Sequence, residues 1–473
     1  MQQKLWINGK FEESQAYKSL KSPYSHEVFA DIAQASAEDV KKAIDAAESA
    51  AKEMRSLPAY KRAEILERVV ELLKEKRTEC AKIIAREAAK PLKAALTEVD
   101  RTILTYQFAS QEARKINGET IPMDGAPGGE GRVAYTVREP LGVIGAITPF
   151  NFPMNLVAHK VGPAIAAGNA VVLKPASQTP LSSYKIAELF AEAGLPSGAL
   201  NIVTGSGSTV GDVLISDDRV AMITFTGSPE VGKSIRENAG LKRVTLELGS
   251  NSAVVIDENT DVRKIVPRIV AGAFNFQGQV CISVQRIFVH EAVFSTFVEN
   301  FVEEAKKLKL GDPLDETTDV SALISQADVD RAQSWIDEAV KNGAELALGG
   351  KSTEGVLHPT VLLNVDLSEK ISCEEAFAPV VHINSFKDFD TALHSVNDSK
   401  YGLQAGVFTN DLPKAFHAAN TLHVGGVMIN DFPTFRVDHM PYGGVKQSGT
   451  GREGIKYAIE EMTELKLVSF HLN

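Results

Sequence analysis

Apolar residues recur at helical spacing through the first quarter of the chain, after a short extended start. Residues 5–7 form a strand-like run that ends at the Asn8-Gly9 turn. Between residues 38 and 115 apolar positions return every three or four residues with charges between them, as in DVKKAIDAAESAAKEM, and this spacing predicts helices. The Gly- and Pro-rich stretch MDGAPGGEGR at 123–132 predicts a loop, and the extended segments beside it predict a hairpin arm.

From Leu141 onward short apolar runs alternate with helical stretches. The runs LGVIGAIT, AVVLKP, LNIVTG, AMITFTG and RVTLELG are separated by helical patterns that begin near residues 153, 182, 208 and 229. A second alternating region extends from SAVVI at 252–256 to GGVMIN at 425–430, and the strand-like run LKLVSF follows near the end. Strand–helix alternation of this kind indicates βαβ units and parallel sheets. The pattern therefore predicts an α/β protein with two parallel-sheet domains and an extended arm.

Composition narrows the class of protein. The 473 residues are 44% hydrophobic and 23% charged, which is typical of a soluble globular protein with two or three domains. A net charge of −11 disfavours nucleic acid or an anionic membrane as partner. The three separated cysteines provide neither a disulfide framework nor a zinc site, so we expect no metal. With no signal pattern and no apolar run near the roughly 18–20 residues of a membrane span, we expect a cytoplasmic location.

Four strand-to-helix turns carry the first candidate chemistry, because ligands of open parallel sheets bind at the carboxyl ends of the strands. Each turn alone is explained equally well by the steric needs of a tight turn. Together, and with Lys174 among them, they favour a dinucleotide site with phosphates at helix N-termini. The turns are ITPFNFP (147–153), LKPAS (173–177), VTGSGSTVG (203–211) and FTGSPEVG (225–232).

Two further residues can each be interpreted either as catalytic or as structural. Glu247, in LELGS at 246–250, is either a partly desolvated general base or a solvated residue at a strand end. Cys281, in FNFQGQVCIS at 274–283, is either a nucleophile or a small buried hydrophobe. Because 34 residues separate them, only the fold brings them together.

The order and spacing of the motifs resemble the aldehyde dehydrogenase superfamily over essentially the whole chain. GQVCISV and EEAFAPV look closest to the lactaldehyde dehydrogenase group, and the chain is more distantly similar to succinate-semialdehyde and non-phosphorylating glyceraldehyde-3-phosphate dehydrogenases. The resemblance implies two Rossmann-type domains and a homodimer or homotetramer. Its expected division is 1–119 with 139–250 for NAD(P) binding, 251–445 for catalysis, and 120–138 with 446–473 for the oligomerisation arm and C-terminal segment. The matching motifs are ITPFNFP, LKPASQTP, FTGSPEVG, LELGS, GQVCIS, CEEAFAPV and PYGGVKQSGTGREG.

The resemblance also implies a catalytic sequence. Cys281 matches the nucleophile, whose thiolate attacks the aldehyde to give a thiohemiacetal and, after hydride transfer, a thioester. Asn151 and the backbone N–H of Cys281 match the oxyanion hole. Glu247 matches the general base that activates the thiol or the hydrolytic water. The implied activity is NAD(P)-dependent oxidation of an aldehyde to its carboxylate.

Several residues match the family's cofactor contacts. Lys174 matches the residue that reaches the adenosine ribose, and Glu375 the carboxylate that holds the nicotinamide ribose. Family members that prefer NAD often have Glu at the position of Ser177, so we expect that NADP is accepted as well as NAD. Ser250 and Ala378 replace glycines that are usual in the family, which puts close backbone approach there in doubt. The remaining predicted contacts are Thr148, Pro149, Phe150, Gly211, Gly227, Ser228, Gly232, Leu248 and Phe377.

The substrate is less well defined by the sequence. By resemblance Arg436 borders the substrate channel, where it would bind an anionic group, and its alternative is a surface arginine paired with Asp438. Arg286 is read as structural. A small polar or anionic aldehyde, such as lactaldehyde or a semialdehyde, is the expected substrate. Two alternatives stay open: a CoA-acylating dehydrogenase, against which the presence of Glu247 argues, and a catalytically silent binding protein with the same fold.

Overall fold

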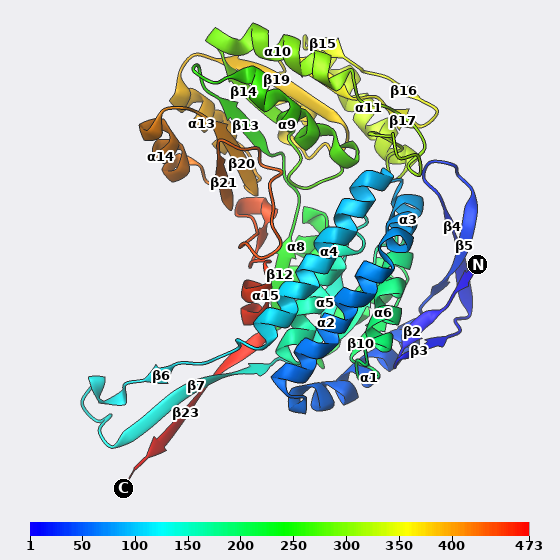
Figure 1. Ribbon diagram of the computed structural model, residues 1–473, viewed down its shortest axis with the longest axis vertical. Coiled ribbons are helices and arrows are strands. Elements are labelled where there is room, and N and C mark those ends of the chain that lie inside the picture. Colours follow the sequence, from blue (N-terminus) through cyan, green and yellow to red (C-terminus); the bar gives the residue numbers. More distant parts are fainter. Residues whose placement is uncertain (473) are drawn as a thin grey trace.

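Two sheets, one above the other in Figure 1, and a long arm below them make up the protein. The computed structural model describes residues 1–472. The α/β fold predicted from the alternating apolar runs is confirmed. Within residues 1–472 no helix is long and apolar enough to cross a membrane.

The first sheet has eight strands in the order β22-β12-β11-β8-β9-β10-β2-β3. Its five central strands are parallel, whereas β22, β2 and β3 run antiparallel to their neighbours. All the predicted strands from LGVIGAIT to RVTLELG therefore lie in one sheet, and their carboxyl ends share one edge. The strands are β2 (Leu5–Ile7), β3 (Lys10–Glu12), β8 (Val143–Ile147), β9 (Ala170–Lys174), β10 (Leu200–Ile202), β11 (Val220–Thr226), β12 (Arg243–Glu247) and β22 (Gly449–Thr450).

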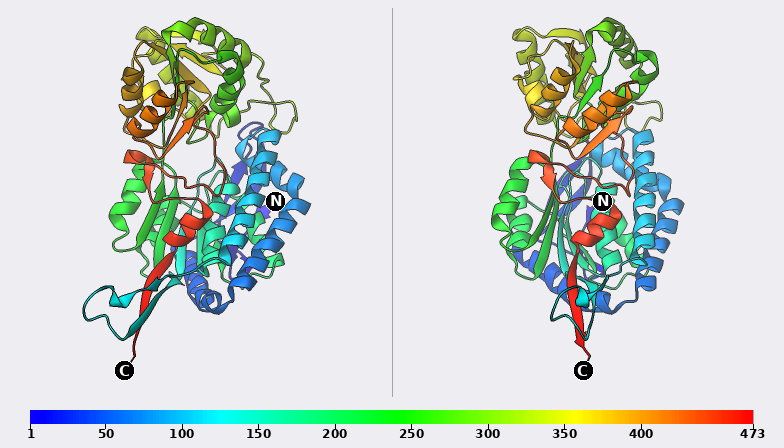
Figure 2. Two further views of the ribbon diagram at one scale, coloured as in Figure 1. Left: turned by 60° about the vertical axis from the view of Figure 1, so that its left-hand side comes forward. Right: turned by 90° about the vertical axis from the view of Figure 1, so that its left-hand side faces the viewer.

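Helices cover this sheet on both sides (Figure 2). The first of them starts at a capping box, in which the Ser36 hydroxyl accepts from Asp39 N–H and Asp39 accepts from Ser36 N–H. Every residue of α5 is buried. The helices are α1 (Ala37–Ser56), α2 (Ala59–Glu75), α3 (Arg77–Ala88), α4 (Leu92–Ala113), α5 (Asn155–Ala167), α6 (Leu181–Glu192), α7 (Asp212–Ser216) and α8 (Pro229–Asn238).

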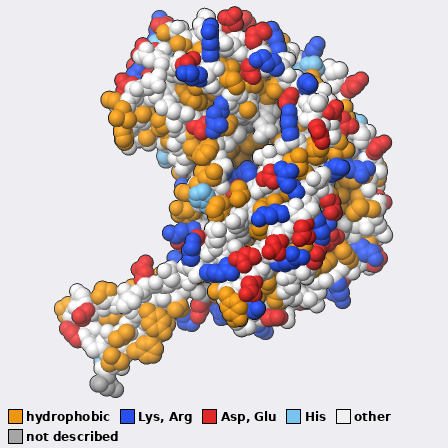
Figure 3. Space-filling model, viewed as in Figure 1, with side chains coloured by type: hydrophobic (Ala, Val, Ile, Leu, Met, Phe, Trp, Pro, Cys, Tyr) orange, Lys and Arg blue, Asp and Glu red, His pale blue; other side chains and the backbone are white. Residues whose placement is uncertain are grey.

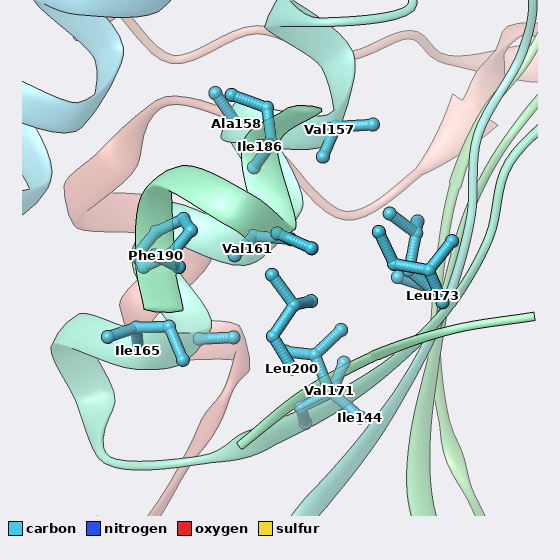
Figure 4. Close-up of a cluster of buried hydrophobic side chains, with 14 of the residues drawn as sticks. Ile144, Val157, Ala158, Val161, Ile165, Val171, Leu173, Ile186, Phe190 and Leu200 are labelled. Carbon is cyan, nitrogen blue, oxygen red and sulfur yellow. The ribbon is translucent and has the colours of Figure 1, made fainter. Parts of the chain in front are cut away.

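The core of the first sheet lies between its strands and the helices α5 and α6 (Figure 4). Val161 and Ile165 of α5 and Phe190 of α6 pack over Val171 and Leu200 of the sheet. Burying each large apolar side chain contributes about 1.5–3 kcal/mol. This packing holds the turn that precedes α5 in place against the strand ends.

The second sheet has seven strands in the order β15-β18-β19-β14-β13-β20-β21, all parallel except the edge strand β15. It is the second α/β region that the sequence predicts. Its strands are β13 (Ala253–Ile256), β14 (Arg286–His290), β15 (Glu345–Leu348), β18 (Thr360–Leu363), β19 (Val380–Phe386), β20 (Gln404–Phe408) and β21 (Gly426–Ile429). Its helices are α9 (Val262–Phe274), α10 (Glu291–Ala305), α11 (Gln326–Lys341), α12 (Lys370–Cys373), α13 (Phe389–Asn397) and α14 (Leu412–Thr421).

The arm is a three-stranded antiparallel sheet that projects from the first domain (Figure 1). The predicted hairpin is present, because β6 (Thr120–Ile121) pairs with β7 (Arg132–Pro140). The strand β23 (Thr463–His471) pairs with β7 along its whole length. Before β23 the chain returns from the second sheet to the first, where it adds β22 and α15 (Ile455–Glu461), which packs on α5.

A further three-stranded sheet near the N-terminus was not among the sequence predictions. It consists of β1 (Gln2–Gln3), β5 (Val28–Gln34) and β4 (Ala16–Lys21). Four of the six residues of β4 are exposed, so it lacks the alternating apolar pattern of a half-buried strand. A small pair of strands, β16 (Ser352–Thr353) and β17 (Val356–Leu357), completes the described elements of the second domain.

Candidate active site

The loop that carries Cys281 has an unusual backbone. Residues 276–278, which are Phe, Gln and Gly, have φ values of 47°, 55° and 69°. Positive φ in residues other than glycine costs about 1–3 kcal/mol each and persists only where the surroundings impose it. Here the side-chain amide of Gln277 donates to the backbone oxygens of Ala89 (3.0 Å) and Ala322 (2.8 Å). The loop that presents the thiol is therefore anchored from both domains.

The thiol of Cys281 keeps some exposure to solvent but is closely surrounded by protein. Burial raises the pKa of Cys281 to about 11, although a hydrogen bond with Tyr442 and the charge of Arg436 lower it. The distance from Cys281 Sγ to Tyr442 Oη is 3.0 Å. Neither of the other cysteines is comparable, because Cys80 is buried in α3 and Cys373 Sγ contacts the backbone of a neighbouring turn.

Asn151 lies in the turn between β8 and α5 and faces the Cys281 loop. Its Nδ2 atom donates to the backbone oxygen of Gln279 at 3.0 Å, which leaves its second N–H free of protein partners in residues 1–472. The backbone N–H of Cys281 likewise makes no hydrogen bond within this range. Two such donors beside a thiol are what an oxyanion hole requires.

Lys90 fixes the turn that contains Asn151 through a hydrogen bond to its backbone. Its ammonium donates to the backbone oxygen of Asn151 at 2.6 Å and forms a buried ion pair with Glu98. The same carboxylate accepts hydrogen bonds from the backbone N–H groups of Met154 (2.9 Å) and Asn155 (3.2 Å). The turn and the start of α5 thus share one buried charge pair.

Glu247 is at the end of β12 and is 4% exposed. Neither of its carboxylate oxygens has a hydrogen-bond partner within residues 1–472. Burial, and then the negative charge of Glu453, raise the pKa of Glu247 well above its ordinary value. The solvated strand-end reading of Glu247 is therefore wrong, and its surroundings favour the protonated carboxyl.

A buried ion network surrounds Glu247. Lys160 Nζ of α5 lies 3.1 Å from one oxygen of Glu453, and Arg436 Nη2 lies 2.8 Å from the other. Although burial opposes ionisation, the two cations hold the pKa of Glu453 below its usual range. The sequence analysis missed Lys160 and Glu453. A signal for Lys160 existed, since an ionisable residue in the otherwise apolar run AHKVGPAIAA calls for a partner.

The side chain of Arg436 is 6% exposed, so its alternative reading as a surface arginine is wrong. Its predicted partner Asp438 is not its ion-pair partner either. Arg436 faces Glu453, whereas Asp438 faces α4 and α5 and binds Arg101 (2.6 Å) and His159 (2.9 Å). The two residues lie close in sequence, but the irregular chain there directs their charges to different helices.

A cavity of about 470 Å³ opens beside Cys281, and Lys90, Arg436 and Tyr442 also line it. Cys281 lies in its wall, and so do the cationic side chains Lys93, Arg101 and Arg436. Lys93 is paired with Asp319 across the two domains. The remaining wall is largely apolar and aromatic and includes Phe152, Phe274, Phe276, Phe432 and Tyr442.

Lys174 and Ser177 lie after β9 on the cofactor side of the predicted site. Lys174 is 8% exposed, yet its ammonium makes only one long hydrogen bond, 3.5 Å, to the backbone oxygen of Pro175. The hydroxyl of Ser177 lies 3.5 Å from the backbone oxygen of Gly205. A buried ammonium with so little bonding fits a nucleotide ribose or phosphate.

The fold requires glycine at some positions of the predicted phosphate turns and not at others. A Cβ at Gly232 would lie 2.5 Å from a methyl group of Leu248, and one at Gly227 would lie 2.5 Å from the ring of Phe225, so packing alone requires both. A Cβ at Gly211 would meet no atom within 4 Å, so nothing in the fold requires glycine there. Ser228 caps the start of α8 through its side chain.

Glu375 lies against the backbone that follows Glu247. Its Oε1 atom accepts from Ser250 N–H at 2.9 Å, and a Cβ at Gly249 would lie 2.5 Å from its Oε2. Only Gly249 therefore needs to be glycine, while Ser250 turns its hydroxyl toward Ser252. Burial raises the pKa of Glu375 to about 7.

Two aromatic rings and a hydroxyl complete the cofactor side. Phe377 has a φ of 47° and packs edge-on against Phe150, with ring centroids 5.7 Å apart. The hydroxyl of Thr148, which precedes Pro149, is buried without a partner within residues 1–472. The predicted residues thus gather at the strand ends of the first sheet and at the loop before β19. Arg286 is buried away from them and donates to backbone oxygens, as expected for a structural residue.

Comparison with known proteins identifies the family. The sequence model of the Aldehyde dehydrogenase family matches residues 11–468. The chain belongs to this family. This aldehyde dehydrogenase is 46% identical over 468 residues to a 3-sulfolactaldehyde dehydrogenase of Priestia aryabhattai, covering 99% of this chain and 98% of that protein. It is 42% identical over 467 residues to a lactaldehyde dehydrogenase of Methanococcus aeolicus, covering 98% of both proteins.

The fold comparison agrees with the family assignment. The crystal structure of glyceraldehyde-3-phosphate dehydrogenase GapN from Methanocaldococcus jannaschii, complexed with NADP, superposes with a TM-score of 0.93 at 42% identity, covering 97% of this chain and 100% of that one. The predicted resemblance to the lactaldehyde dehydrogenase group is confirmed. The enzyme is an NAD(P)-dependent aldehyde dehydrogenase.

Proposed function

We propose that this aldehyde dehydrogenase oxidises a small aldehyde that carries an anionic group, such as a carboxylate or sulfonate, with Cys281 as the nucleophile. The observation that carries the proposal is that Arg101 and Arg436 line the same cavity as Cys281. Each keeps unused donors, since Arg436 Nε and Arg101 Nη1 have no hydrogen-bond partner within residues 1–472. Guanidinium groups suit planar or tetrahedral anions. The sulfonate in the name of the 3-sulfolactaldehyde relative fits this chemistry.

The reaction follows from the arrangement of three residues. Cys281 loses its proton to Glu247 or solvent, and Sγ bonds to the carbonyl carbon of the aldehyde. Negative charge then develops on the carbonyl oxygen, where Asn151 Nδ2 and the Cys281 N–H can donate to it, and each such donor lowers the barrier by about 3 kcal/mol. Hydride loss leaves a thioester on Cys281. Glu247, ionised again after passing any thiol proton to solvent, then takes a proton from a water that attacks the thioester. The C–S bond breaks, and the carboxylic acid and the Cys281 thiolate are released.

NAD or NADP, when bound, supplies the hydride acceptor. Lys174, Ser177 and the start of α8 would hold its adenosine and phosphate groups, and Glu375 the ribose near the nicotinamide. Ser177 places a neutral hydroxyl three residues after a barely bonded lysine, so nothing there repels a 2′-phosphate. We therefore propose that NADP is accepted, as it is in the GapN complex.

The arm supports assembly with a second copy of the chain. It exposes apolar side chains on a thin three-stranded sheet (Figure 3), and such a surface in water favours association. These residues are Val133, Tyr135, Leu465, Leu467 and Phe470. A homodimer or homotetramer is proposed. Light scattering of the enzyme should give a mass above one chain, and the double variant Leu465→Asp/Leu467→Asp should reduce it.

The substrate proposal is tested by pairs of aldehydes that differ only in charge, such as 3-sulfolactaldehyde against lactaldehyde, assayed with NADP and NAD. The anionic member should have the higher kcat/KM. In Arg101→Met or Arg436→Met its kcat/KM should fall about 10- to 100-fold, as expected for a lost charge-assisted hydrogen bond, and that of the neutral member much less. Arg55→Met, on the exposed end of α1, is the matched control.

Three outcomes would overturn the proposal. Equal losses for charged and neutral aldehydes would remove the two arginines from substrate binding. Formation of acyl-CoA on adding CoA would replace hydrolysis with acyl transfer. Unchanged turnover in Cys281→Ala would exclude the thioester route.

A further inference from the structure

The hydroxyl of Tyr442 is 3.0 Å from the sulfur of Cys281, a contact that plays no part in the reaction described above. Tyr442 belongs to the segment that returns the chain from the second sheet to the first. It is 3% exposed and lines the cavity. Within residues 1–472 no other side chain forms a hydrogen bond with this sulfur.

The direction of the hydrogen bond depends on the charge of the sulfur. A thiolate has no proton and only accepts, so the phenol must be the donor once Cys281 is ionised. Burial, and then the neighbouring sulfur of Cys281, raise the pKa of Tyr442 well above its ordinary value. The phenol therefore keeps its proton at any working pH.

Arg436 strengthens this donor. Its guanidinium carbon lies 3.7 Å from the centre of the Tyr442 ring, in cation–π contact. A cation over the ring face draws electron density from the phenol oxygen and makes its O–H more acidic. The cation is itself held by Glu453 at 2.8 Å.

Glu453 also fixes the backbone of Tyr442. The two residues exchange both main-chain hydrogen bonds, 3.0 Å from Tyr442 N–H to Glu453 and 2.7 Å in the reverse direction. One residue thus sets both the position of the ring and the position of the cation above it. The ring is thereby held with its hydroxyl beside the sulfur.

We propose that Tyr442 is a catalytic residue, whose hydroxyl donates to Cys281 Sγ and stabilises the thiolate. This inference rests on the proposed role of Cys281 as nucleophile. The proton of the thiol leaves to Glu247 or solvent, and Tyr442 keeps its own proton throughout. When the C–S bond forms, sulfur loses its negative charge and becomes a weak acceptor, so the hydroxyl is released toward the cavity.

Other charged groups act on the same pair and must be held constant in a test. Arg436 favours the thiolate, whereas Glu375 and Glu247 oppose it. Lys160 and Arg452 act on Glu247, and Lys160 and His159 act on Glu453. The other titratable side chains that line the cavity are Lys90, Lys93, Glu98, Arg101 and Asp319. Replacing the phenol by a phenyl ring alters none of these groups.

The test compares wild type with Tyr442→Phe, which keeps the ring, its volume and the contact with Arg436. The rate at which iodoacetamide alkylates Cys281, located by mass spectrometry, is followed between about pH 6 and 11 in the cofactor-free enzyme. The pKa of Cys281 is about 11, so the midpoint is fitted from the rise in rate below it. It should increase by about one pH unit or more in the variant, which lowers the alkylation rate at a given pH about tenfold, and kcat should fall about tenfold with KM for the cofactor unchanged. Ultraviolet absorbance of the thiolate against pH should give the same shift.

Tyr106→Phe is the matched control, because this buried hydroxyl in α4 has no hydrogen-bond partner within residues 1–472. It should leave the alkylation profile unchanged. An equal midpoint in wild type and Tyr442→Phe would overturn the inference while leaving Cys281 as nucleophile. Full activity in Cys281→Ala would overturn the proposed function itself, whatever Tyr442→Phe does.

Discussion

The ammonium of Lys90 lies 2.6 Å from the backbone oxygen of Asn151, inside the protein and paired with the carboxylate of Glu98. Neither charged side chain reaches solvent, since they are 1% and 0% exposed. A charge pair this deep is strongly destabilising to break, because the remaining partner stays buried and unpaired. The pair therefore both positions Asn151, the proposed oxyanion donor, and contributes to the stability of the first domain.

Lys90→Met should lower the free energy of unfolding by about 3–5 kcal/mol, because it leaves the Glu98 carboxylate buried without its cation. Urea unfolding followed by tryptophan fluorescence measures the loss. Lys61→Met is the control, since its pair with Glu64 is half exposed and contributes about 0.2–1 kcal/mol. Equal effects of the two variants would contradict a structural role for the buried pair.

Glu247→Gln should slow steady-state turnover by about 10²- to 10⁴-fold, because hydrolysis of the thioester loses its base. One equivalent of reduced cofactor per site should still form in a rapid first turnover. Since burial and Glu453 raise the pKa of Glu247, the wild-type rate should rise with pH above the ordinary carboxyl range, and that of the variant should not. Stopped-flow absorbance checks both points, with Glu345→Gln on the exposed strand β15 as control.

Ser177→Glu should raise the KM for NADP by about tenfold or more and leave that for NAD unchanged or lower. The added carboxylate would repel the 2′-phosphate and accept hydrogen bonds from the ribose hydroxyls of NAD. Parallel assays with the two cofactors give the ratio. Ser177→Ala, which stays neutral, should keep the use of NADP, and a loss as large as that in the Glu variant would refute the charge argument.

Stability should fall with acid partly through His382. Burial, and then the charge of Arg286, lower the pKa of His382 to about 3 in the folded protein, against about 6.5 in the unfolded chain. Between these values only the unfolded chain binds the proton. The contribution of His382 to stability is therefore present above pH 6.5 and is lost by about 1.4 kcal/mol per pH unit as pH falls toward 3.

The variant His382→Phe removes the contribution of His382 to the pH dependence of stability. Nε2 of His382 has no hydrogen-bond partner within residues 1–472 and the ring lies edge-on to Phe288, so a phenyl ring fits the site at the loss of one hydrogen bond, from Nδ1 to Asn384 (3.1 Å). Urea midpoints measured from pH 7.5 downward should decline less steeply in the variant than in wild type. Parallel declines would mean that other groups account for the acid sensitivity.

Helices and strands whose apolar residues recur at regular spacing could be predicted from the sequence. The helical region between residues 37 and 113, the parallel strands of the first sheet, the α/β character of the second region and the hairpin arm all follow from spacing and turn residues. The strands β4 and β5 could not, because β4 is mostly exposed and neither strand has a strict alternation of buried and exposed residues. Short edge strands depend on their partners more than on their own residues.

The site was predictable only through its family motifs. Local sequence left the role of Cys281 open, and it contains no sign that Phe276 and Gln277 adopt positive φ, a region such residues normally avoid. Tyr442 was missed because 161 residues separate it from the sulfur that it contacts. The partner of Arg436 was mistaken for the nearer Asp438, since sequence distance says little about direction in an irregular segment.

Because the chain returns to the first sheet, its C-terminal segment contributes a charged residue, Glu453, to the ion pairs beside Glu247. A chain that ended before residue 446 would keep the central strands of both parallel sheets and the Cys281 loop. It would lack Glu453. Lys160 and Arg436 would then be two buried cations without a counter-ion. The surroundings of Glu247 are therefore complete only when the C-terminal segment has folded back and placed Glu453 between the two cations.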